Sequence, residues 1–123
     1  MFNNRHYDTV AFDVRNDAAI LFFARTTARG DIADYLLLMH AEGEEFVDSI
    51  YLEMNDGEFS GHDCIAEAAM TGNVLTIMLN EPATELNGAT ELVITFDDTD
   101  ENRANVETGA FRVLADKLRG GHA

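Results

Sequence analysis

One short segment of this 123-residue chain gathers several reactive side-chain types around a glycine: Ser60, Gly61, His62, Asp63 and Cys64. A thiol and an imidazole that converge can act as a nucleophile and its general base. Residues two apart in a strand point to the same face, so contact between His62 and Cys64 is conceivable. No glycine-rich oxyanion loop or distinctive nucleophile motif surrounds them, however. The sequence therefore favours a structural cysteine in a half-buried strand.

Metal and cofactor motifs are also weak. The four histidines share no ligand spacing, and neither a His-Glu-x-x-His motif nor an EF-hand loop occurs. Asp97, Asp98, Asp100 and Glu101 could attract a hard cation, but they lack the glycine and the distal glutamate of a calcium loop. The same carboxylates suit the N-terminus of a helix, so capping and solvation are preferred. No phosphate-binding glycine loop is present, and we predict no cofactor, no metal site and no enzymatic activity.

The composition is that of one folded domain spanning residues 1–123. Apolar residues make up 46% of the chain and charged residues 25%, which is usual for a compact domain. The single cysteine allows no intramolecular disulfide, which suits a reducing compartment. The longest apolar run, residues 18–24, is far shorter than the roughly 20 residues of a membrane-spanning helix. The first residues lack the layout of a secretory signal, so we expect a soluble, cytoplasmic protein.

The charge is unevenly distributed along the chain, whose formal net charge is −15. Residues 30–102 contain 18 of the 23 acidic residues and no lysine or arginine, so all eight basic residues lie in the flanks. Because such a window cannot neutralise itself with local ion pairs, we expect one side of the protein to carry a strong negative potential. That field disfavours nucleic acids and anionic membranes and favours a basic protein partner. Solubility or adaptation to high salt is an open alternative.

Apolar alternation predicts six to seven mostly antiparallel strands. Asn16-Asp17 predicts a hairpin turn, and Asn55-Asp56-Gly57 predicts a second, tight one, because Asn and Gly adopt positive φ cheaply. Gly61 predicts a bulge or an irregular edge. Residues 80–89 are expected to form a loop, and residues 65–70 fit either a strand or a helical turn. The predicted strands are residues 9–15, 18–24, 35–40, 49–54, 58–64, 74–79 and 91–96.

The C-terminal segment has helical periodicity. Thr99 can cap a helix whose first turn is acidic. Apolar residues follow at spacings of three and four as far as Leu118, with Phe111 on the flank, and Gly120-Gly121 would end the helix. The predicted fold class is therefore α+β, a mostly antiparallel sheet with one C-terminal amphipathic helix packed on a face. The residues at these spacings are Val106, Ala110, Val113, Leu114 and Lys117-Leu118.

Residues 35–96 resemble a family of bacterial polymorphic-toxin immunity proteins, the tenth immunity family. The resemblance lies in the Tyr35-Leu strand, the Tyr51-Leu-Glu strand with its Asn-Asp-Gly turn, the Ser60-Gly segment, and two further strands at 74–79 and 91–96. The chain departs from the family pattern at residues 62–64, where aromatic and glycine residues are usual. The resemblance implies inhibition of a cognate toxin by direct binding.

An acidic inhibitor can occupy the surface with which a basic toxin holds phosphate. Tyr51 could provide an aromatic anchor for that partner. Alternatively, the acidic loops are only solvated and Tyr51 packs on a neighbouring strand. Two rival functions stay open: a nucleic-acid mimic that inhibits a defence nuclease, and a small ligand-binding or structural domain. The oligomeric state is not predicted. The predicted contact residues are Glu42, Glu44, Glu45, Asp48, Tyr51, Asp56 and Glu58.

Overall fold

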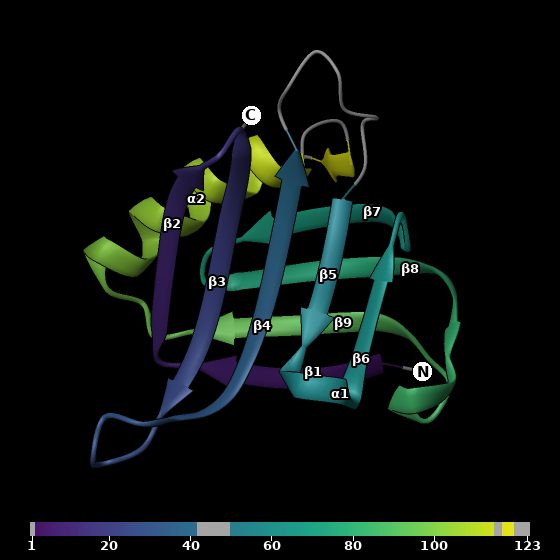
Figure 1. Ribbon diagram of the computed structural model, residues 1–123, viewed down its shortest axis with the longest axis horizontal. Helices are drawn as coiled ribbons and strands as arrows, with labels where there is room; N and C mark the ends of the chain where they lie inside the picture. The colour runs from purple at the N-terminus through teal and green to yellow at the C-terminus, as the bar shows by residue number, and fades with distance from the viewer. Residues whose placement is uncertain (1, 42–49, 115–116, 120–123) are drawn as a thin grey trace.

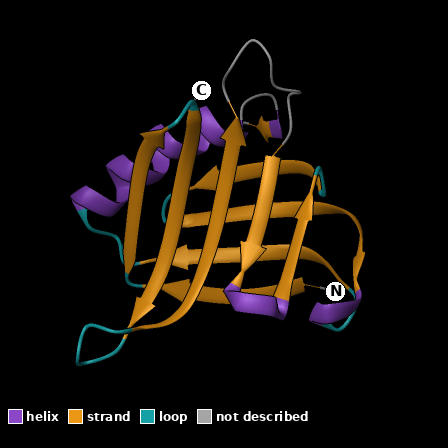
Figure 2. Cartoon of the chain, viewed as in Figure 1, coloured by secondary structure: helices purple, strands orange, loops and turns teal. Residues whose placement is uncertain are grey.

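Residues 2–41, 50–114 and 117–119 are described in the computed structural model, and they form two five-stranded sheets with one long helix beside them (Figure 1). Figure 2 shows that strands dominate and that helix α2 is the one long helix among the described residues. The elements in chain order are β1 (Phe2–Tyr7), β2 (Thr9–Arg15), β3 (Ala18–Thr26), β4 (Ile32–Ala41), β5 (Ile50–Met54), α1 (Asn55–Glu58), β6 (Phe59–His62), β7 (Ile65–Thr71), β8 (Val74–Ala83), the 3₁₀ turn η1 (Thr84–Leu86), β9 (Ala89–Phe96), α2 (Asp100–Leu114) and β10 (Leu118–Arg119).

The α+β class is confirmed, but the prediction of six to seven strands in one sheet is wrong. The described residues contain nine strands of at least four residues and a tenth, β10, of two. Sheet A has the order β1-β9-β8-β7-β10, and sheet B has the order β2-β3-β4-β5-β6. Neighbouring strands pair antiparallel except at the two edges of sheet A, where β1 runs parallel to β9 and β10 parallel to β7.

The hydrophobic core lies between the two sheets, whose strands cross one another in Figure 1. In β3 the inward-facing side chains of Leu21 and Phe23 are fully buried, as the alternation of the strand requires. The Phe23 ring contacts two further buried rings, those of Tyr7 and Phe96, at centroid distances of 5.9 and 6.4 Å. These three rings link β1 and β9 of sheet A to β3 of sheet B.

Helix α2 packs on the inner face of sheet B, beside sheet A. The Thr99 hydroxyl accepts the Asn102 amide at 3.1 Å, which confirms the predicted cap. The helix ends at Leu114, and Leu118 lies in β10, so the helix is shorter than the spacing predicted. At Gly109 an added Cβ would lie 2.6 Å from Leu21 Cδ1, so the missing side chain allows the close approach of α2 to β3. No helix among the described residues has both the length and the apolar character needed to cross a membrane.

Asn102, in the first turn of α2, is the one charged or polar side chain among the described residues that is classed as buried. Its Oδ1 accepts the Val10 amide at 3.0 Å, and its Nδ2 donates to the carbonyls of Asp8 and Asp97, each at 3.0 Å. Asn102 thus satisfies three main-chain groups where β1, β2 and the end of β9 meet. Asn105 Nδ2 adds a bond to the Val10 carbonyl at 3.0 Å. The two asparagines fix α2 along the edge of β2.

The turn predictions have mixed outcomes. Asn16 and Asp17 adopt φ of 49° and 62° and join β2 to β3 as predicted. Residues 65–70 form a strand. The prediction for the connection after β5 is wrong in detail, because the connection is the four-residue helix α1 rather than a tight turn. Gly61 pairs regularly with Leu52, without a bulge. The expected loop at 80–89 is also wrong in its first part, because β8 continues to Ala83 before η1 begins.

Candidate functional site

The outer face of sheet B carries several half-buried apolar and aromatic side chains. Along β3, β4 and β5, half-buried side chains alternate with core residues and so point away from sheet A. The strand register places Phe22 opposite Leu37, and it places Met39 opposite Tyr51. The Phe22 ring stacks on Tyr35 at a centroid distance of 5.5 Å. We call this surface the outer patch: Ile20, Phe22, Tyr35, Leu37, Met39 and Tyr51. Sheet A and α2 lie on the opposite face of sheet B (Figure 1).

One carboxylate lies beside the two tyrosines of the outer patch. Glu53 accepts a short hydrogen bond from the Tyr35 hydroxyl and another from the Tyr51 hydroxyl at 2.6 Å. These two hydrogen bonds, chiefly the one from Tyr35, hold the pKa of Glu53 below its usual value. The hydrogen bond that Tyr51 donates to Glu53 raises the pKa of Tyr51. On its other side the Tyr51 ring lies 4.8 Å from the His62 ring. Both tyrosine rings are therefore held in defined orientations.

The predicted contact residues in the β5–β6 connection follow the end of β5 that is opposite Ile50. In α1, Asn55 and Gly57 have positive φ, 50° and 87°, as those residue types predicted. Asn55 Oδ1 accepts the Tyr35 amide at 2.8 Å, and its Nδ2 donates to Glu58 at 2.7 Å. Asp56 lies within this helix. The side chain of Asn55 thus joins α1 to β4.

Glu58 already has an arginine partner. Arg5 from β1 donates two hydrogen bonds to its carboxylate, at 3.2 and 2.8 Å, and lies 3.4 Å from Asp34 of β4. The Arg5 hydrogen bond holds the pKa of Glu58 below its usual value, and Glu58 raises the pKa of Arg5 in return. The acidic window is therefore partly neutralised by an arginine from its N-terminal flank. A partner that approached Glu58 would find its carboxylate already paired with Arg5.

The structure places only part of the predicted contact set. Tyr51 belongs to the outer patch, and Asp56 and Glu58 lie in α1 at the far end of the hairpin. Residues 52–54 of β5 lie between Tyr51 and α1, so Tyr51 and the first residue of α1 are roughly 13 Å apart along the chain. The remaining predicted contacts lie outside the described residues: Glu42, Glu44, Glu45 and Asp48. Sequence reasoning missed the apolar members of the outer patch, because half-buried and core-facing residues look alike in an apolar strand.

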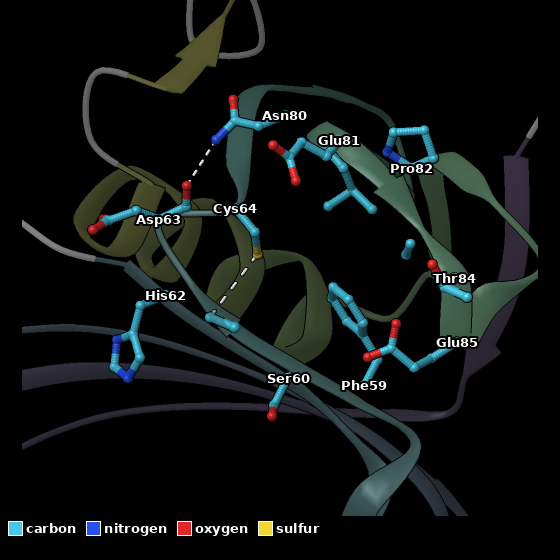
Figure 3. Close-up of a pocket in the computed structure, with 13 residues that line it drawn as sticks. Phe59, Ser60, His62, Asp63, Cys64, Asn80, Glu81, Pro82, Thr84 and Glu85 are labelled. Carbon is cyan, nitrogen blue, oxygen red and sulfur yellow. Dashed lines mark hydrogen bonds between the residues drawn. The ribbon is translucent and has the colours of Figure 1, made fainter.

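A groove of about 420 Å³ lies between β6 and the segment formed by the end of β8 and η1 (Figure 3). Its thirteen lining residues include three carboxylates, those of Asp63, Glu81 and Glu85, and no lysine or arginine. Phe59 and Leu79 supply apolar walls. The Asn80 side chain donates to the Asp63 carbonyl at 2.7 Å and so ties β8 to the end of β6. The groove thus combines apolar walls with acidic groups.

The conceivable contact between His62 and Cys64 does not form, and the structural cysteine was the preferred interpretation. Strand β6 ends at His62, and Asp63 has φ of 55°, so the simple alternation of a strand does not extend to Cys64. Figure 3 shows the imidazole pointing away from the thiol. Cys64 Sγ lies 3.9 Å from the Gly61 carbonyl, and burial raises the pKa of the thiol. A protonated, half-buried thiol without a base is a poor nucleophile, which agrees with the structural interpretation.

The acidic cluster before α2 has local partners. Asp98 accepts a hydrogen bond from Arg103 Nε at 3.0 Å, and Asp97 Oδ1 lies 2.7 Å from His6 Nε2. The other ring nitrogen of His6 lies 2.7 Å from the Thr95 hydroxyl. This Thr-His-Asp chain was not predicted, because it depends on β1 pairing with β9. This chain of side chains is exposed and lies outside the groove. It joins β1 to β9. Within the described ranges, no three His, Cys, Asp or Glu side chains are placed to hold a metal ion.

Carboxylates occur on both sheets: Glu53 lies on β5 of sheet B, whereas Glu67 and Glu91 lie on β7 and β9 of sheet A. The single acidic side stays a prediction. The outer patch is the surface on which the described residues offer aromatic contacts. No protein-family model matches the chain, and no curated protein matches it either.

Proposed function

We propose that the protein is an acidic inhibitor of the immunity type, which binds and neutralises a cognate basic protein toxin through the outer patch. The observation that carries this proposal is an apolar, aromatic sheet face that no described helix or strand covers, in a chain of net charge −15. Large uncovered apolar patches on small domains mark interaction sites. Tyrosine is among the residues that dominate binding energy at such sites.

The charge and the patch have different roles in this proposal. A net charge of −15 attracts a basic protein from a distance and raises the rate of encounter, with an effect that falls as salt is added. The outer patch supplies the short-range contact, because burial of Tyr51 and its apolar neighbours removes apolar area from water. Carboxylates spread over both sheets suit long-range attraction, which depends on total charge.

The outer patch favours a protein partner over nucleic-acid mimicry. A mimic would present rows of carboxylates spaced like phosphates, whereas the patch has aliphatic and aromatic side chains with Glu53 beside them. A small-ligand domain is the second candidate, and the groove beside β6 is the observation in its favour.

The test is co-expression of the chain with the product of its neighbouring gene, followed by purification and kinetics of the complex. Tyr51→Ala is expected to weaken binding by about 2 kcal/mol or more, mainly through faster dissociation. Charge reversal of Glu44 and Glu45 together should slow association without changing the melting temperature. Phe111→Ala is the matched control, since Phe111 is an aromatic on α2 that is 59% exposed, away from the patch. Equal effects of Tyr51→Ala and Phe111→Ala, or association that salt does not slow, would contradict the proposal.

A further inference from the structure

Strand β6 leaves one edge of sheet B open. It is the last strand in the order of that sheet, so no described strand pairs with its far side. The Asp63 amide donates to the Ile50 carbonyl at 2.9 Å in the same register as the β5–β6 ladder. Hydrogen-bonded pairs alternate in an antiparallel ladder, so Gly61 and Phe59 bond to β5. The main-chain N–H and C=O groups of Ser60 and His62 therefore point away from β5.

Helix α2 covers part of the opposite edge of sheet B. There the side chains of Asn102 and Asn105 bond to the amide and carbonyl of Val10 in β2. Proteins normally cover or blunt strand edges in this way, because an open edge can pair with another chain. The β6 edge has no such cover from the described helices. An open edge beside a groove is the arrangement in which an added strand finds both main-chain partners and side-chain pockets.

The groove has the chemistry to choose the side chains of that strand. Phe59 and Gly61, which alternate with the outward-facing residues of β6, line the groove together with the edge residues Ser60 and His62, so the groove opens beside this edge. Every second side chain of an added strand would point to this same side. Figure 3 shows Glu81 and Glu85 on the β8–η1 wall of the groove. Without a lysine or arginine in its lining, the groove would attract cationic side chains.

We infer that the β6 edge and the groove bind an extended segment bearing lysine or arginine at alternate positions, as a sixth strand of sheet B. This inference rests on the proposed function, because the segment would belong to the basic partner. The main chain of the segment bonds to Ser60 and His62, which supplies affinity that does not depend on sequence. The alternate cations meet Glu81 and Glu85, which supplies the selectivity for a basic segment.

The probe is a labelled ten-residue peptide that alternates lysine with threonine, titrated against the whole protein by fluorescence anisotropy. Ser60→Pro is the decisive variant, because it removes an outward N–H without breaking the β5 ladder, and proline is tolerated on edge strands. It should weaken binding at least tenfold. Glu81→Gln with Glu85→Gln should weaken binding roughly three- to tenfold, as expected for two exposed ion pairs. A peptide with glutamate in place of lysine should not bind.

The control removes the same charge elsewhere: Glu91→Gln with Glu107→Gln changes one glutamate on β9 and one on α2. Binding unchanged by Ser60→Pro, or weakened as much by the control pair as by the groove pair, would overturn the inference. If Ser60→Pro fails to fold, wild-type protein is titrated with two peptides N-methylated at alternate amides, one at the odd positions and one at the even positions. If neither peptide binds more weakly than the unmethylated one, the inference is overturned as well.

The two proposals fail separately. Phe22→Ala should leave peptide binding unchanged, because Phe22 is the outer-patch ring on β3, three strands away from β6 in sheet B. A whole partner that is weakened by Tyr51→Ala but not by Ser60→Pro would refute strand addition and keep the proposed function. A peptide that binds as described, together with a neighbouring gene product that does not bind, would refute the proposed function alone.

Discussion

Replacing Asn102 by alanine should destabilise the protein more than any other single loss of a described side-chain hydrogen bond. The substitution leaves three main-chain groups without their partners: the Val10 amide and the carbonyls of Asp8 and Asp97. At about 1 kcal/mol for each net bond, the free energy of unfolding should fall by about 3 kcal/mol. The melting temperature should fall by about 10 °C or more, given some 3–5 °C per kcal/mol for a chain of this size.

Urea unfolding followed by circular dichroism measures the effect, with the midpoint lowered and the m-value unchanged. Asn105→Ala is the matched control on the same helix, because it removes one bond to the Val10 carbonyl, and it should cost about 1 kcal/mol. Asn102→Asp keeps the acceptor but sets a carboxylate against two carbonyls, so it should destabilise at least as much as alanine. A loss at Asn102→Ala no larger than that at Asn105→Ala would refute the reasoning.

Two further predictions concern packing and pH. Gly109→Ala should destabilise the protein by about 1 kcal/mol, because the clash with Leu21 and Phe12 outweighs the roughly 1 kcal/mol gained in helix propensity. The control Thr108→Ala should leave the stability unchanged or raise it. Thermal melts that rank the two variants the other way would refute the close packing of α2 on β3. Arg5→Met should cost about 1–3 kcal/mol at pH 7, between the values for exposed and buried ion pairs. Because Arg5 lowers the pKa of Glu58 from 4.5, that stabilisation is present above about pH 4.5 and is lost as the pH falls, so the difference in unfolding free energy between wild type and variant should shrink below pH 4.5 in urea titrations.

The elements set by local patterns could be predicted from the sequence. The β2–β3 hairpin followed from Asn16-Asp17 between apolar runs, and the start of α2 followed from Thr99 and the acidic turn after it. Strands β4, β5 and β9 followed from apolar runs of strand length. In each case neighbouring residues determine the conformation, through a turn that favours positive φ, a helix cap or a run of apolar side chains.

The elements set by distant partners could not be predicted. Residues 2–7 are mostly polar, and they form β1 because β9 offers a free edge at the other end of the sequence. Leu118 leaves the helical pattern for the same reason, because it pairs with Ala68 of β7. The candidate site shares this limit. The outer patch depends on strand register, and the groove depends on β8 continuing past Pro82.

The parallel pairing of β1 with β9 affects the order in which the protein can fold. His6 and its contact Thr95 are separated by 89 positions, and such long loops are slow to close. A ribosome that adds 5–20 residues per second takes roughly 5–20 s to go from one strand to the other. During that time the hairpins of sheet B can form, while the N-terminal segment waits for its neighbour. Completion of sheet A is therefore a late step, because β1 can pair only after β9 has been synthesised.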